Sequence, residues 1–164
     1  MTDYGLLAKQ IVSLADVDAH WLPVLSNAAA LLWDALDDIN WAGFYLVDPA
    51  TVTGSGVSTP ELRLGPFQGK VACVRIPFGR GVCGTAAATK TSQLVEDVHQ
   101  FPGHIACDSV SNSEVVVPIV KDNQVVGVLD IDSPSVARFT QEDLTGLEQV
   151  VKALESCANF SDFC

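Results

Sequence analysis

Two valine-rich segments separated by Asp122-Asn123 form the stretch EVVVPIVKDNQVVGVLDID, which runs from Glu114 to Asp132. A short polar pair between two β-branched runs is typical of the turn of a β-hairpin. The stretch therefore predicts two neighbouring antiparallel strands. Any fold proposed for the chain has to contain a sheet built around this hairpin.

Strand alternation assigns the acidic residues of the hairpin to one face. It places Leu129 and Ile131 on one side and four residues on the other: Val126, Val128, Asp130 and Asp132. The turn brings Glu114 opposite the two aspartates, within one residue of register. A single acidic residue would indicate a solvated face. Three carboxylates converging at one end of a sheet indicate a polar pocket.

Helical and extended patterns flank the hairpin. Amphipathic periodicity predicts three main helices, over Asp3–Leu14, from Asp16–Asp18 to Ala35, and over Gln141–Ala158 with Thr140 as cap. Further strands are expected at WAGFYLVD, Glu61–Phe67, VACVRIPF and SQLVED, a short helix at VCGTAAAT, and a polar loop over Pro49–Pro60. The pattern predicts one α+β domain over residues 1–164, with a central, mostly antiparallel sheet and the N- and C-terminal helices on one face.

Charge and hydropathy exclude several classes of function. The formal net charge of −11 argues against nucleic-acid binding, which requires a basic face. No apolar run is long enough to cross a membrane, and the N-terminal residues lack the features of a secretory signal. We therefore expect a cytoplasmic protein. Its five cysteines, an odd number, do not indicate a secreted disulfide framework.

Cys107 has the most reactive setting among the cysteines. It lies in the Pro/Gly-rich segment FPGHIACD, close to His104 and Asp108. A buried filler, a metal ligand, a structural disulfide partner and a nucleophile all remain open, and the loop position favours a reactive thiol.

The other cysteines invite plainer interpretations. Cys83 follows the glycines of GRGVCG near a helix N-terminus, which predicts a lowered thiol pKa. Cys73 alternates with Val71 on an expected strand, and both cysteines are more often core residues in such positions. Cys157 and Cys164 are interpreted as structural or incidental. Five residues offer zinc ligands without a close ligand pair, so zinc is the less favoured alternative: Cys73, Cys83, His99, His104 and Cys107.

The turn GRGVCG, Gly79 to Gly84, formally matches a dinucleotide-binding motif, with Asp97 about 20 residues further on. We reject that function because an antiparallel hairpin follows instead of βαβ units. The exposed amides at a helix N-terminus still suit a small anion such as a carboxylate.

The predicted pocket has the properties of an amino-acid site. Crowded carboxylates cannot all ionise, so one holds a proton while the others attract an ammonium group. Trp41 and Tyr45 share a face of their strand and are placed to form a wall for a side chain, although such aromatics are more commonly core residues. The residues together predict a binding site for a free amino acid.

With these residues identified, the chain closely resembles the free methionine-(R)-sulfoxide reductases, which are built on a single GAF domain. The matching runs are NWAGFYL, LGPFQGKVACVRIPFGRGVCGTAA, VEDVHQFPGHIACD, SEVVVP and GVLDIDSP followed by ARF. They span most of the chain from Asn40 to Phe139. The Pro49–Pro60 segment departs from the family pattern in its length.

The resemblance implies a role for each matching residue. It implies that Cys107 is the nucleophile, Cys73 the resolving cysteine and Cys83 a third active-site cysteine. It implies that Glu114, Asp130 and Asp132 are catalytic and substrate-binding acids. Trp41 and Tyr45 would hold the substrate methyl group. The family also implies a homodimer, reduction by thioredoxin, and no metal or other cofactor.

Three functions are consistent with these features. The first is reduction of free L-methionine (R)-sulfoxide through a sulfenic acid on Cys107 and a disulfide with Cys73. The second is a non-catalytic GAF sensor whose cysteines act as redox switches. The third is a thiol peroxidase that consumes peroxide directly. The carboxylate set favours the first, because neither rival requires it.

Overall fold

The computed structural model describes residues 1–48 and 60–161, so the expected loop at 49–60 lies almost wholly outside the described residues. The helices are α1 (Tyr4–Ala15), α2 (Trp21–Ala35), α3 (Gly81–Thr89), α4 (Gln141–Cys157) and the short 3₁₀ helix η1 (Val98–Gln100). The strands are β1 (Trp41–Asp48), β2 (Glu61–Gly69), β3 (Arg75–Pro77), β4 (Gln93–Val95), β5 (Ser113–Lys121) and β6 (Gln124–Ser133). Within these ranges, no helix has the length and apolar character needed to span a membrane.

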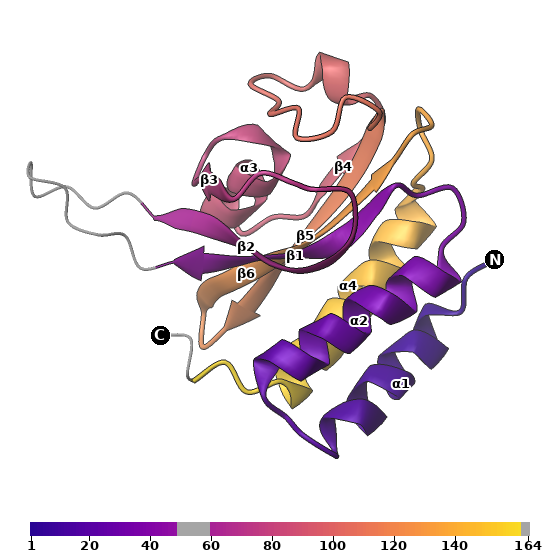
Figure 1. Cartoon of the computed structure of the whole chain (residues 1–164), viewed down its shortest axis with the longest axis vertical. Coiled ribbons are helices and arrows are strands. Elements are labelled where there is room, and N and C mark those ends of the chain that lie inside the picture. Colours follow the sequence, from indigo (N-terminus) through magenta and orange to yellow (C-terminus); the bar gives the residue numbers. More distant parts are fainter. Residues whose placement is uncertain (49–59, 162–164) are drawn as a thin grey trace, which may run out of the picture.

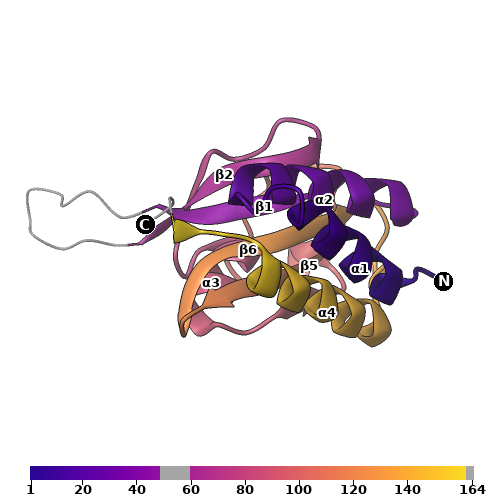
Figure 2. The same cartoon turned by 90° about the horizontal axis from the view of Figure 1, so that it is seen from below.

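The six strands form one sheet in the order β3-β2-β1-β6-β5-β4, and every neighbouring pair is antiparallel. Helices α1, α2 and α4 lie on one side of this sheet, whereas α3 lies on the other (Figures 1 and 2). The predicted α+β class and the placement of the terminal helices on one face are confirmed.

Each face of the sheet has its own hydrophobic core. Leu129 and Ile131 pack with α1, α2 and α4, whereas Val128 packs with α3 on the opposite side. The predicted alternation therefore holds for these residues. Val126 was assigned to the wrong face, because the register with β5 shifts after Ile119 and places Val126 among the residues under the long helices. A β-bulge resets alternation in this way because it adds one residue to one strand.

Two predicted boundaries need correction. Helix α2 begins at Trp21 and not at Asp16–Asp18, because Asp16 still donates its backbone N–H to α1 at the carbonyl of Val12. His20 accepts a hydrogen bond from the backbone N–H of Leu22 at 3.1 Å and so caps α2. The strand predicted over VACVRIPF is limited to Arg75–Pro77, which form β3, so residues 71–74 lie in a loop.

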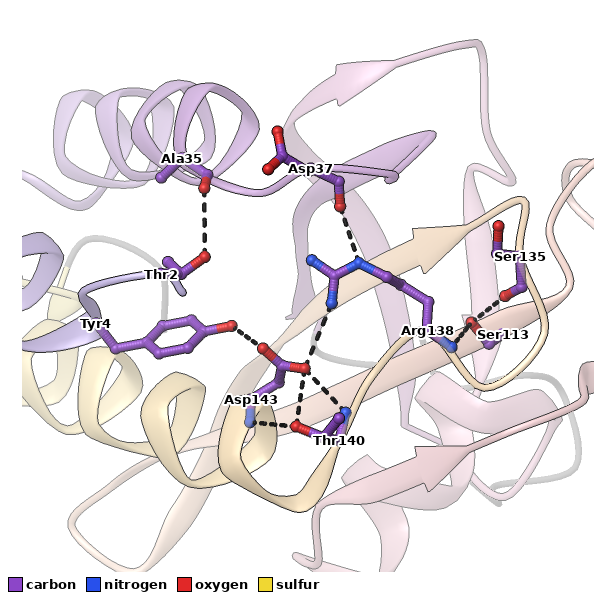
Figure 3. Close-up of polar contacts among 9 residues, drawn as sticks. All are labelled: Thr2, Tyr4, Ala35, Asp37, Ser113, Ser135, Arg138, Thr140 and Asp143. Carbon is purple, nitrogen blue, oxygen red and sulfur yellow. Dashed lines mark hydrogen bonds and ion pairs between the residues drawn. The ribbon is translucent and has the colours of Figure 1, made fainter.

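Helices α1 and α4 are joined by a polar network at their ends (Figure 3). The hydroxyl of Tyr4 donates to Asp143 at 2.6 Å. Asp143 also forms a capping box with Thr140, the predicted cap of α4. Arg138 contacts the same carboxylate at 3.3 Å. The network fixes the start of α4 against α1, and the two helices complete the cover over their face of the sheet.

Gly146 is expected to be essential for this helix pair. A Cβ atom at Gly146 would lie 2.1 Å from Cδ2 of Tyr4, a distance that forces the ring to move. Gly146→Ala should therefore lower the free energy of unfolding by about 1–3 kcal/mol, despite the better helix propensity of alanine. Urea unfolding measures the change. Gly5→Ala, where the nearest atom is 3.4 Å away, should be neutral or stabilising. An unchanged midpoint for Gly146→Ala would contradict this packing argument.

Candidate active site

A pocket lies on the α3 side of the sheet, at the end where β1, β5 and β6 bring their polar residues together. Its lining includes nearly all the residues predicted for the site: Trp41, Tyr45, Cys83, Cys107, Glu114, Asp130 and Asp132. Cys73 is absent from the lining but is bonded to Cys107, which belongs to it. The predicted set therefore converges in one place.

The three acidic residues occupy adjacent positions on the central hairpin. Glu114 pairs with Asp132, as the sequence predicts, and Asp130 lies two residues further along the same face. Glu114 and Asp130 are buried, with exposures of 6% and 5%. Burial and the neighbouring carboxylates raise the pKa of Glu114 well above its ordinary value. Burial raises the pKa of Asp130 to about 6. The pocket therefore favours the protonated form of its carboxyl groups.

Asp132 experiences the same forces as its neighbours. Burial, followed by the charges of Asp130 and Asp108, raises the pKa of this carboxyl well above its ordinary value. The expectation that crowded acids share a proton is therefore supported by the direction of all three shifts.

Cys83 lies against these acids, inside the first turn of α3. Its thiol donates to Oε1 of Glu114 at 3.8 Å, and its side chain is buried. Burial, and then the charges of Asp130 and Glu114, raise the pKa of the thiol. The lowered pKa predicted from the helix N-terminus is wrong, because lost hydration and nearby carboxylates outweigh the helix dipole here. Cys83 is a protonated thiol in this structure.

Cys73 and Cys107 are joined by a disulfide, with their Cα atoms 5.5 Å apart. The assignment of Cys73 to a strand is wrong, because it lies in the loop between β2 and β3. Cys107 lies in the loop between η1 and β5. In the sheet order, β1 and β6 separate these two connections, so the disulfide spans the pocket end of the central strands. Both cysteines are half-buried, which leaves the bond partly accessible.

Aromatic rings form one wall of the pocket. The rings of Trp41 and Tyr45 stack with centroids 5.6 Å apart, and Trp41 stacks on Phe67 at 5.2 Å. The indole N–H of Trp41 donates to the backbone carbonyl of Lys70 at 3.2 Å, which fixes the ring orientation. The prediction that Trp41 and Tyr45 share a face is confirmed. An apolar ligand group can pack against this wall.

The N-terminus of α3 contributes backbone to the same pocket. Arg80, Gly81 and Val82 all line it. Gly81 has a φ of +62°, and a Cβ there would lie 3.2 Å from Ile105 of the Cys107 loop. The first amides of a helix have no intrahelical partner and carry partial positive charge. This end of the pocket is therefore suited to an anionic group.

Asn40, which the sequence did not identify, supports the pocket without lining it. Its side-chain amide donates to Asp108 at 3.2 Å and to Ser111 at 3.0 Å, both in the Cys107 loop. Its backbone N–H donates to the carbonyl of Asp132 at 2.9 Å. Asn40 thus connects the loop to the acidic end of β6. The only sequence signal is its position as a polar residue directly before a buried strand.

His104 contributes an imidazole to the edge of the pocket. Its Nε2 lies 3.7 Å from Oε2 of Glu114. Burial lowers the pKa of the ring, so His104 is neutral at pH 7. His99, another candidate zinc ligand, pairs instead with Asp97 at 2.8 Å on the exposed side of η1. The five cysteine and histidine residues considered for zinc therefore do not form one site.

The fold and pocket define a class of protein. Residues 7–157 match the GAF domain family. The chain is 51% identical, over 98% of its length and 91% of the relative's, to the free methionine-R-sulfoxide reductase of Escherichia coli (strain K12). The solved structure of fRMsr of Staphylococcus aureus in its reduced form is 52% identical, with a TM-score of 0.84 and coverage of 97% of both chains.

A further solved structure adds a ligand. The free methionine-R-sulfoxide reductase of Neisseria meningitidis, in complex with its substrate, is 44% identical, with a TM-score of 0.83 over 93% of this chain and 86% of the other. The chain belongs to the family of free methionine-R-sulfoxide reductases.

Proposed function

We propose that the chain reduces free L-methionine (R)-sulfoxide to L-methionine. The observation that carries this proposal is the disulfide between Cys73 and Cys107 beside a pocket whose lining includes the carboxyl groups of Glu114, Asp130 and Asp132. A redox-active cysteine pair supplies two electrons. A carboxyl-rich pocket accommodates the ammonium group that only a free amino acid presents. The substrate-bound relative from Neisseria meningitidis supports the same assignment.

Each part of the substrate has a complementary group in the pocket. Burial raises the pKa of Asp130 only to about 6, so it is mainly ionised at neutral pH and pairs with the ammonium. The N-terminus of α3 accepts the carboxylate. The sulfoxide methyl group packs against Trp41 and Tyr45. This placement leaves the sulfur accessible to Cys107.

The reduction proceeds in two chemical steps. The thiolate of Cys107 attacks the sulfoxide sulfur, and the protonated Glu114 donates its proton to the oxygen. The oxygen then passes from the substrate sulfur to the Cys107 sulfur as the bond between the two sulfurs breaks, so that methionine leaves and Cys107 is left as a sulfenic acid. The thiol of Cys73 then attacks the Cys107 sulfur, which releases water and forms the disulfide. Cys83 donates a hydrogen bond to Glu114 and supports its position.

The cycle closes when an external dithiol reduces the disulfide by thiol–disulfide exchange. We assign this step to thioredoxin, in the cytoplasm, and we assign a homodimeric state, because these are the properties that the family resemblance implies. The half-buried sulfurs of Cys73 and Cys107 are accessible enough for a partner thiolate to attack.

A substrate panel tests the proposal. The purified chain is mixed with thioredoxin, its reductase and NADPH, together with the free R epimer, the free S epimer or a peptide-bound sulfoxide. We expect NADPH consumption with the free R epimer alone, at least about 100-fold above the other two substrates, because a peptide-bound residue has no ammonium for Asp130.

Two results would overturn the assignment. Faster turnover with hydrogen peroxide than with the sulfoxide would identify a thiol peroxidase. Stoichiometric oxidation of the cysteines without turnover of any sulfoxide would identify a redox sensor.

A further inference from the structure

Cys83, Glu114 and Asp130 form a compact donor cluster inside the pocket. One ligand atom from each of these buried residues lies within 4.8 Å of the others, and the sulfur of Cys83 is 3.8 Å from Oε1 of Glu114. Ligand atoms around a tetrahedral zinc ion lie roughly 3.3–3.8 Å apart, as follows from bond lengths of about 2.0–2.3 Å. Small side-chain shifts would bring the three atoms to that separation.

An independent observation indicates that the cluster is built for a cation. Oδ1 of Asp130 is buried and has no hydrogen-bond partner among the described residues. A buried carboxylate oxygen without a donor is costly, and such atoms are normally satisfied by a ligand, an ion or water. The unpartnered oxygen lies in a pocket that is also lined by Asp108, Glu114 and Asp132, so a positively charged ligand is the one that offsets this cost best.

His104 lies next to the cluster without belonging to it, and its ring can supply a fourth donor. Its Nε2 lies 3.7 Å from Oε2 of Glu114, at the edge of the cluster. A thiolate, an imidazole and two carboxylates are a donor set that matches zinc better than magnesium or calcium, which prefer oxygen alone. The first three donors do not include Cys73 or Cys107, so the cluster is complete while those two cysteines are bonded to each other.

We propose that the pocket binds a thiophilic divalent cation of the zinc class at Cys83, Glu114 and Asp130, with His104 or water as the fourth ligand. Binding replaces the thiol proton of Cys83, which is released to solvent, with a bond from the sulfur to the metal. The metal occupies the place of the substrate ammonium at Asp130. It is therefore a competitive inhibitor, a consequence that rests on the proposed function, whereas the binding itself does not.

Cobalt(II) titration of the full chain, with the Cys73–Cys107 disulfide intact, tests the binding. Cobalt in a thiolate site gives a near-ultraviolet charge-transfer band and intense visible bands. We expect one equivalent to bind in the wild type and in Cys157→Ser, with displacement by zinc. The charge-transfer band should be lost in Cys83→Ser. In Asp130→Asn, which retains the thiol, the affinity should fall at least about 10-fold. Thermal melting establishes that each variant is folded.

Two results would overturn the metal site. A charge-transfer band that survives in folded Cys83→Ser would place the metal elsewhere, and the absence of any band in the wild type would eliminate the site. The inhibition is measured separately, as a rise in KM for the sulfoxide with kcat unchanged as zinc is added. Cobalt bands in a protein that reduces no sulfoxide would uphold the metal site and reject the proposed function. Sulfoxide reduction without cobalt bands would uphold the proposed function and reject the metal site.

Discussion

Cys107→Ser should abolish sulfoxide turnover, with a loss of at least about 10³-fold in kcat. A serine hydroxyl is far less nucleophilic than a thiolate toward sulfur and forms no disulfide with Cys73. The NADPH-coupled assay with free methionine (R)-sulfoxide measures the loss. The matched control is Cys157→Ser at the end of α4, which does not line the pocket and should retain activity within about two-fold.

The companion variant Cys73→Ser separates the two chemical steps. Its Cys107 thiolate can still reduce one substrate molecule, so we expect about one equivalent of methionine per chain and then arrest as the sulfenic acid. A thioredoxin-dependent steady state in Cys73→Ser would contradict the assigned resolving role. Full activity in Cys107→Ser with loss in Cys157→Ser would overturn the whole catalytic assignment.

Glu114→Gln should lower kcat by about 10²–10⁴-fold, because the amide retains the shape of the acid but does not transfer its proton. Burial and the neighbouring aspartates raise the pKa of Glu114. The required protonated form therefore predominates below that pKa and is lost as pH rises through it. Wild-type kcat should consequently decline on the alkaline side, and the residual activity of Glu114→Gln should lack that decline.

The pH profile of kcat, measured with saturating sulfoxide, tests this role. Glu61→Gln is the matched control, because Glu61 is on β2, ion-paired with Arg75 at 3.1 Å and outside the pocket. It should leave both kcat and the pH profile unchanged. If Glu114→Gln instead raised KM alone, Glu114 would be a substrate ligand, and one of the two aspartates would have to supply the proton.

The central hairpin was predictable because its signals are local. The Asp122-Asn123 turn was enough to place Glu114 opposite the two aspartates, within one residue of its register with Asp132. Alternation along WAGFYLVD was enough to put Trp41 and Tyr45 on one face of their strand. The face predicted for Val126 was wrong because of the β-bulge. A bulge arises from the pairing of two strands, so the sequence of one strand alone does not reveal it.

Parts of the site depend on tertiary environment and were not predictable from local sequence. The thiol of Cys83 is at a helix N-terminus, which suggests a thiolate, but its pKa is raised by burial and by acidic residues on β5 and β6. Asn40 joins Asp108 and Ser111, residues that are far from it in the sequence. The pairing of Cys73 with Cys107 came from the family resemblance and not from spacing.

The Cys73–Cys107 disulfide ties together two loops that line the pocket. Residues of both connected loops line the pocket, including Ala72 on one side and Ile105 on the other. Once the Cys73–Cys107 bond forms, these loops are held together with their Cα atoms 5.5 Å apart and cannot separate. Under the proposed function, Cys107 is then no longer a free thiolate, so the chain reduces no further sulfoxide until a reductant has opened the bond. The rate at which the reductant opens the bond would therefore set the share of chains that are ready for the next turnover.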